Sequence, residues 1–157
     1  MMTADAFKKL CDAVEGYTTL ELFEEAQKLL DELPPKLKIT REVIILHMTL
    51  LVKQKEYHKA SFLAETLSLF EPDHVEGLLI VASYRYQAGA FDEALQWLMS
   101  VEKKCSGHDH FHYICAQCHA ALGNMDEAKA SLKIASEKSE IQKLKAVDDP
   151  VFDAIFG

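Results

Sequence analysis

The amino-acid sequence predicts an all-α protein built from stacked helix pairs, and two observations carry this prediction. First, the chain has only 6 glycines and 4 prolines among its 157 residues. That supply is sparse for an all-β protein and suits helices joined by short links. Second, one short sequence pattern recurs four times at a spacing of 34 residues. Self-similarity at such a period is the signature of stacked repeat units.

The recurring pattern ends on an alanine. It reads FEEA, YHKA, FDEA and MDEA, and its final residues are Ala26, Ala60, Ala94 and Ala128. An aromatic residue or a methionine stands three positions before each alanine. A small side chain lets two helices cross closely. We therefore expect each alanine on the second helix of a pair, where that helix crosses the first.

Each repeat reads as two helices joined by a short turn. In the second repeat, residues 44–52 and 62–70 carry apolar side chains at helical spacing. Gly89 and Gly123 lie where the first helices of the third and fourth repeats would end. Glycine adopts the left-handed conformation of such an end without a steric clash. Pro72 then separates the second repeat from the third.

The segment after the last repeat is expected to close the stack. Residues 141–147 would continue as a helix that covers the apolar end of the last pair, as stacked repeats require for solubility. Asp149 and Pro150 would start a final short turn that packs back through residues 151–156. A tail that occupies a groove instead stays open as the alternative.

The 34-residue helix–turn–helix unit resembles the tetratricopeptide repeat (TPR). Registering the family pattern on the four alanines divides a single domain into four repeats and a C-terminal cap, at residues 7–40, 41–74, 75–108, 109–142 and 143–157. The resemblance implies a right-handed superhelical α-solenoid. The family's second small position matches only at Ala82 and Ala116, and its closing proline only at Pro72. The C-terminal run to "KAVDDPVFDAIFG" looks like small bacterial TPR proteins of unassigned role.

The TPR resemblance also implies a binding surface on the concave face, formed by set positions of the first helices. Those positions give an apolar and a hydrogen-bonding ladder, made of Ile45, Thr49, Leu79, Ser83, Tyr86, Tyr113 and Gln117. Extended or helical peptides bind such surfaces through apolar anchors flanked by polar groups. Burial of these residues in the core, or coverage by a second copy of the chain, stays open as an alternative.

The charge balance limits the partners. With 17 basic and 25 acidic residues the formal net charge is −8, which opposes a phosphate backbone and disfavours nucleic acid. No secretory pattern and no bilayer-length apolar run is visible, so we expect a cytoplasmic protein with reduced cysteines and no membrane partner. The Lys/Asn/Arg clamp that holds acidic chaperone tails in related domains is missing, so we do not expect that ligand.

A different class of function rests on the cysteines and histidines of residues 105–119. Thiolates and imidazoles are zinc ligands, and the candidate set is Cys105, His108, His110, Cys115, Cys118 and His119. The string CAQCH also matches a haem attachment motif, but it falls inside a predicted helix and lacks an export signal. A metal- or redox-responsive protein is therefore the alternative function, and we expect no cofactor.

Nothing in the sequence predicts catalysis. No glycine-rich phosphate loop, nucleophile elbow or HExxH motif is present. The acidic pairs that follow each turn fit the first turns of helices, where the helix dipole favours carboxylates. The sequence therefore predicts a non-enzymatic protein–protein interaction module, a scaffold or chaperone-like adaptor. It would bind a peptide or a partner helix in the concave groove.

Overall fold

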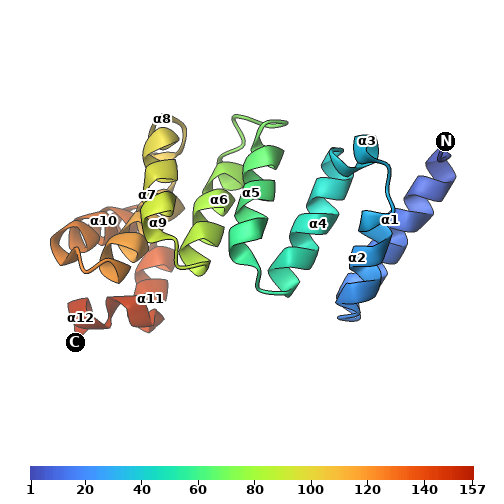
Figure 1. Cartoon of the computed structure of the whole chain (residues 1–157). Coiled ribbons are helices and arrows are strands. Elements are labelled where there is room, and N and C mark those ends of the chain that lie inside the picture. Colours follow the sequence, from blue (N-terminus) through green and yellow to red (C-terminus); the bar gives the residue numbers. More distant parts are fainter. The chain divides into compact units, whose positions relative to one another are not determined.

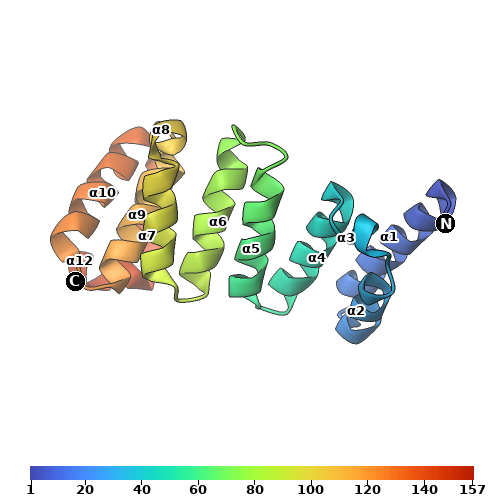
Figure 2. The same cartoon turned by 45° about the horizontal axis from the view of Figure 1, so that its top comes forward.

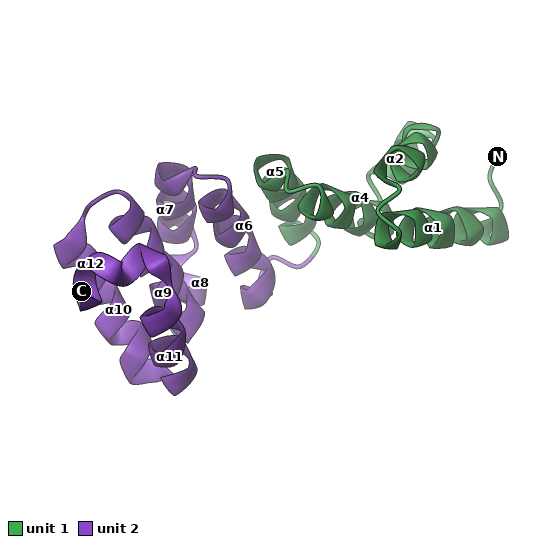
Figure 3. Cartoon of the chain, turned by 90° about the horizontal axis from the view of Figure 1, so that it is seen from below, with its two compact units in different colours: residues 1–70 green, residues 71–157 purple.

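The computed structural model describes all 157 residues and contains twelve α-helices, one short 3-10 helix and no strand (Figure 1). Successive helices pack as pairs, which confirms the predicted all-α, TPR-like α-solenoid class. The chain divides into two compact units, residues 1–70 and 71–157 (Figure 3). None of the helices has the length and apolar character needed to cross a lipid bilayer.

The first unit contains α1 (Ala4–Thr19), α2 (Phe23–Asp31), α3 (Pro35–Lys38), α4 (Arg41–Lys53) and α5 (Tyr57–Ser68). Helix α1 pairs with α2 and α4 with α5, and α1 also packs against α4. The core of this unit is formed by Val14, Ala26, Leu30, Leu33, Val43 and Leu50. Two neighbouring first helices, α1 and α4, are thereby in direct contact.

The second unit contains α6 (Val75–Gln87), α7 (Phe91–Ser100), α8 (Glu102–Cys105), α9 (Asp109–Ala121), α10 (Met125–Lys138), α11 (Glu140–Asp148), η1 (Pro150–Phe152) and α12 (Asp153–Phe156). Helix α6 pairs with α7 and α9 with α10, side by side in Figures 1 and 2, and α6 also packs against α9. Helix α11 returns over α10 and α9, and η1 lies against α9. The C-terminal segment therefore packs on the last helix pair.

The repeat is visible in the backbone as well as in the sequence. The four recurring alanines are completely buried on the second helix of each pair. The residue just past each first helix has a left-handed φ, at Glu21 (59°), Lys55 (61°), Gly89 (77°) and Gly123 (82°). These positions are also 34 residues apart. The same turn is thus built four times, and only two copies use glycine.

Helix α11 differs from the helix expected to cover the apolar end of the stack. It turns Gln142 and Ala146 inward, while Ile141, Leu144 and Val147 stay 61–66 % exposed. The amide of Gln142 donates a 2.9 Å hydrogen bond to Asp109 Oδ2 at the start of α9. A polar contact therefore occupies the position where the sequence suggested an apolar one.

Candidate functional site

The predicted groove residues are divided between the two units. Ile45 and Thr49 lie on α4 of the first unit. The others lie on α6 and α9 of the second unit, and they are Leu79, Ser83, Tyr86, Tyr113 and Gln117. Each unit has a cleft on these first helices, which we name the α1–α4 cleft and the α6–α9 cleft.

The α1–α4 cleft has a volume of about 360 Å³. It is lined by Cys11, Asp12, Glu15, Thr18, Thr19, Glu42, Ile45, Leu46, Thr49 and Lys53. Cys11, Ile45 and Leu46 are half-buried and form the apolar part of the lining. The sequence-predicted residues Ile45 and Thr49 thus border one cleft, together with residues of α1.

Hydrogen-bond acceptors dominate the polar part of this lining. The hydroxyls of Thr18, Thr19 and Thr49 each donate to the carbonyl four residues earlier, at 2.8, 2.9 and 2.8 Å. A hydroxyl has one proton to donate, so each keeps only lone pairs for other partners. Burial raises the pKa of the Cys11 thiol, and the negative charges of Asp12 and Glu42 raise it further.

The α6–α9 cleft has a volume of about 490 Å³. Its lining consists of Ser83, Tyr86, Gln87, His110, Tyr113, Gln117, Lys145, Asp148 and Asp149. Four of the predicted groove residues, all except Leu79 in this unit, therefore line a single cleft. The end of α11 and the residue after it form another wall.

The C-terminal segment is bonded directly to the predicted groove residues of α9. Asp149 Oδ2 accepts hydrogen bonds from the Tyr113 hydroxyl (2.9 Å) and from Gln117 Nε2 (2.8 Å). Its Oδ1 accepts the backbone N–H of Val151 at 3.1 Å and so caps η1. The Phe152 ring is completely buried and meets the Tyr113 ring edge-on, with centroids 5.6 Å apart. The segment caps the last pair and, in doing so, covers part of the predicted groove.

Burial also shifts the ionisation of the tyrosines of this cleft. It raises the pKa of Tyr86 to about 12, with a smaller contribution from the charge of Asp149. The pKa of Tyr113 is raised as well, first by burial and then by its hydrogen bond to Asp149. The pKa of His110 is lowered, chiefly by burial and then by the charge of Lys145. The cleft therefore favours the neutral forms of all three side chains.

Leu79 lies in the hydrophobic core rather than on an open surface. Its side chain is 2 % exposed and belongs to a cluster that includes Leu78, Ala82 and Leu98. Tyr113 is 5 % exposed and contributes to the second cluster, around Phe152. The expected apolar ladder is therefore largely covered in the second unit, because the neighbouring helices and the C-terminal segment pack on it. Trp97 also packs internally, donating a 2.8 Å hydrogen bond to the Leu78 carbonyl.

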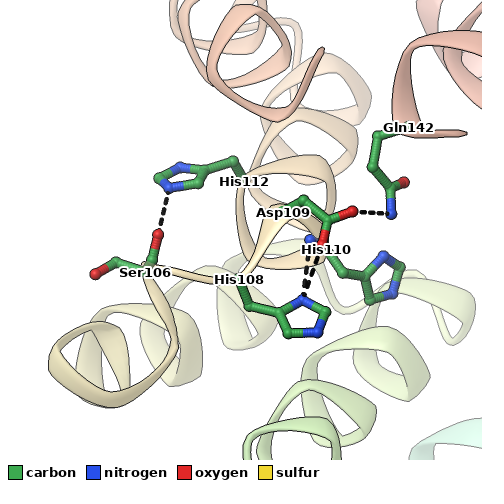
Figure 4. A network of polar contacts seen from close by, with 6 residues as sticks. All are labelled: Ser106, His108, Asp109, His110, His112 and Gln142. Carbon is green, nitrogen blue, oxygen red and sulfur yellow. Dashed lines mark hydrogen bonds and ion pairs between the residues drawn. The ribbon is translucent and has the colours of Figure 1, made fainter. Parts of the chain in front are cut away.

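The histidines near residue 110 make contacts with neighbouring protein groups (Figure 4). His108 Nδ1 accepts the His110 backbone N–H at 3.2 Å and so caps α9. His112 Nε2 lies 2.8 Å from the Ser106 carbonyl oxygen. The Asp109–Gln142 contact links the start of α9 to α11. No group of three or more His, Cys, Asp or Glu side chains is arranged to hold a metal ion.

The cysteines of the metal-binding alternative are enclosed in the second unit. Cys105 and Cys118 are completely buried in the cluster with Phe111 and Ile114, and Cys115 packs against that cluster. Burial raises the pKa of both Cys115 and Cys118 to about 12 and also raises that of Cys105. Burial thus disfavours the thiolate form in which a cysteine acts as a redox nucleophile.

Several residues of the two clefts were not selected from the sequence, among them Asp12, Thr19, Glu42, Lys145 and Asp149. Glu42 precedes the groove residue Ile45 by three residues, nearly one helical turn. The residues next to the groove positions on the same helix face could therefore have been predicted from the sequence. Lys145 and Asp149 lie beyond the repeats, where the repeat register gives no signal.

Comparison with known proteins identifies the repeat. The sequence model of the family described as "Anaphase-promoting complex, cyclosome, subunit 3" matches residues 53–135, slightly more than half of the chain. None of the curated proteins compared with the chain matches it. The matched segment runs from the end of α4 into α10 and covers three of the recurring alanines. The predicted TPR resemblance is confirmed, and the chain belongs to this TPR-type repeat family.

Proposed function

We propose that this protein is a non-catalytic interaction module that holds a peptide segment or a partner helix against the first helices of its repeats. TPR-type repeat families are typically non-catalytic scaffolds for protein–protein interaction. One observation carries the proposal for this chain. The predicted residues Ile45 and Thr49 border a cleft of about 360 Å³ whose apolar part is only half-buried. We place this action in the cytoplasm, as expected from the sequence.

A partner segment would gain affinity by burying its apolar side chains on Ile45, Leu46 and Cys11. Each Å² of apolar surface removed from water contributes roughly 25 cal/mol, less the cost of ordering the segment. The α6–α9 cleft of the other unit has a more polar lining, which includes Ser83, Gln87 and Lys145. The mode of binding is an extended or helical segment with spaced anchors.

Site-specific photocrosslinking tests this proposal with a matched pair of positions. Thr49 lines the α1–α4 cleft, whereas Thr66 lies on the second helix α5. Both are exposed, and both donate to the carbonyl four residues earlier, at 2.8 and 2.9 Å. A benzophenone side chain at Thr49 should crosslink one specific protein in an extract of the source cells, and the same group at Thr66 should not. Equal crosslinking at both positions, or none at Thr49, would refute the proposal. A crosslink to a second copy of the chain would replace it by self-association.

A further inference from the structure

The α1–α4 cleft has a marked imbalance between hydrogen-bond acceptors and donors. Thr18, Thr19 and Thr49 present only hydroxyl lone pairs, since their protons are given to their own helices. The carboxylates of the lining are acceptors as well. The Lys53 ammonium group is the one charged donor among the lining side chains. A ligand that satisfies this lining must bring N–H groups of its own.

The lining of the α1–α4 cleft is also negatively charged, which agrees with its excess of hydrogen-bond acceptors. Asp12 and Glu15 come from α1 and Glu42 comes from α4, so two helices contribute carboxylates to one cleft. All three are exposed. Against one lysine, three carboxylates leave a formal excess of two negative charges. Asp12 and Glu42 line the cleft together with Cys11, and their negative charges raise the pKa of its thiol.

We propose that the α1–α4 cleft recognises a lysine or arginine side chain of a partner protein segment, an inference that rests on the proposed function. The hydrocarbon stem would lie on Ile45 and Leu46, and the cationic head would reach the carboxylates of Asp12, Glu15 and Glu42. Long basic side chains bury their stems on apolar surface and keep their charged ends in polar surroundings. Charge-assisted hydrogen bonds to carboxylates are stronger than neutral ones.

Binding of short labelled peptides tests this inference directly. Three fluorescein-labelled peptides share a leucine-rich frame and differ only in carrying two lysines, two glutamines or two glutamates. At roughly 0.15 M salt, where exposed charges are screened beyond about 8 Å, fluorescence anisotropy should show the lysine peptide binding at least about tenfold more tightly than the glutamine peptide. The glutamate peptide should bind most weakly. Equal affinity of all three peptides would overturn the inference.

A matched pair of double variants separates a site from general attraction to an acidic protein. Glu15→Gln/Glu42→Gln removes two charges from the cleft, and Glu24→Gln/Glu32→Gln removes two from α2 and its end. All four side chains are exposed, and Glu42 and Glu24 both lie in the first turn of a helix. Both variants have a formal net charge of −6 instead of −8. Only the cleft variant should bind the lysine peptide more weakly, by about tenfold. An equal loss in both variants would overturn the inference.

Cys11 is a natural reporter of where the peptide binds. It lines the cleft and is half-buried, whereas Cys105 and Cys118 are completely buried. The lysine peptide should slow the modification of Cys11 by a thiol reagent, whereas the glutamate peptide should leave its rate unchanged. Peptide mass spectrometry measures this rate. Binding without protection of Cys11 would place the basic segment elsewhere and overturn the inference.

The two proposals fail separately. A specific crosslink at Thr49, combined with no preference for the lysine peptide, would retain the interaction function and discard the basic ligand. Protection of Cys11 by the lysine peptide, combined with no partner at Thr49, would retain the chemistry of the cleft and discard the proposed function.

Discussion

The hydroxyl of Tyr113 donates a 2.9 Å hydrogen bond to Oδ2 of Asp149, 36 residues further along the chain. Gln117, one helical turn after Tyr113, donates to the same oxygen at 2.8 Å. A single carboxylate therefore fixes the start of the C-terminal segment on α9. Because both donors are predicted groove residues, the same contact decides how much of the α6–α9 cleft is open.

Replacement of Asp149 by alanine should loosen the C-terminal segment. The Tyr113 and Gln117 donors would lose their acceptor, and η1 would lose its cap. Partly buried donors without a partner cost about 1–3 kcal/mol. Hydrogen exchange of residues 146–156 should accelerate by at least roughly tenfold, since about 1.4 kcal/mol corresponds to that factor. Asp148→Ala, at an exposed neighbour, is the control and should leave the exchange rates nearly unchanged.

Replacement of Phe152 by alanine should destabilise the second unit strongly. The ring is completely buried among Tyr113, Ala116 and Leu132. Truncation of a buried phenylalanine typically costs about 3–5 kcal/mol, because a cavity remains. Urea unfolding followed by the fluorescence of Trp97 measures the loss. Phe156→Ala is the matched control, since Phe156 is 54 % exposed, and it should cost less than about 1 kcal/mol. Equal effects of the two variants would contradict the buried position of Phe152.

Two tyrosines should ionise late in an alkaline titration. Folding raises the pKa of Tyr86 from 10.0 to about 12, and that of Tyr113 is raised in the same direction. Above pH 10 the unfolded chain therefore loses protons that the folded chain keeps, and the free energy of unfolding falls as the pH rises through the folded pKa. The absorbance of phenolate near 295 nm should show a late phase. Tyr86→Phe should remove part of that phase.

Replacing glycine by alanine should change stability in opposite directions at different positions, even where the added Cβ has equal room. An added Cβ at Gly16, Gly89 or Gly123 meets no atom within 4 Å. Gly89 and Gly123 have positive φ, so alanine there should cost about 1–2 kcal/mol. Gly16 lies within α1, and alanine there should stabilise by about 0.5–1 kcal/mol. Lys55→Gly, at the equivalent turn, should be neutral or stabilising. Thermal unfolding checks the sign of each change.

The repeat period predicted much of the fold, because the helix-crossing alanines are a local feature of every unit. All four are completely buried as expected. The turns were predicted at Gly89 and Gly123 but not at Glu21 and Lys55, since neither residue type favours a left-handed φ. The first two repeats form the same turn without a residue type that would predict it from the sequence.

The candidate site was predictable only where it follows the repeat register. Ile45 and Thr49 occupy register positions and border a cleft, whereas Asp12 and Glu42, two of its three carboxylates, lie outside the register. Leu79 occupies a register position too, yet it is buried, because burial depends on which helices pack over it. The Asp149 contact joins residues from separate parts of the chain, and periodicity carries no information about such pairings.

The orientation of α11 about its own axis follows from a polar contact rather than from its large apolar residues. Its large apolar residues Ile141, Leu144 and Val147 face solvent, and the inward side offers Ala146 and the amide of Gln142. The hydrogen bond to Asp109, whose pKa is lowered chiefly by this contact, therefore selects the angle of α11 about its own axis. Helix α11 is oriented by a polar contact, and burial of its apolar residues alone would favour turning it the other way.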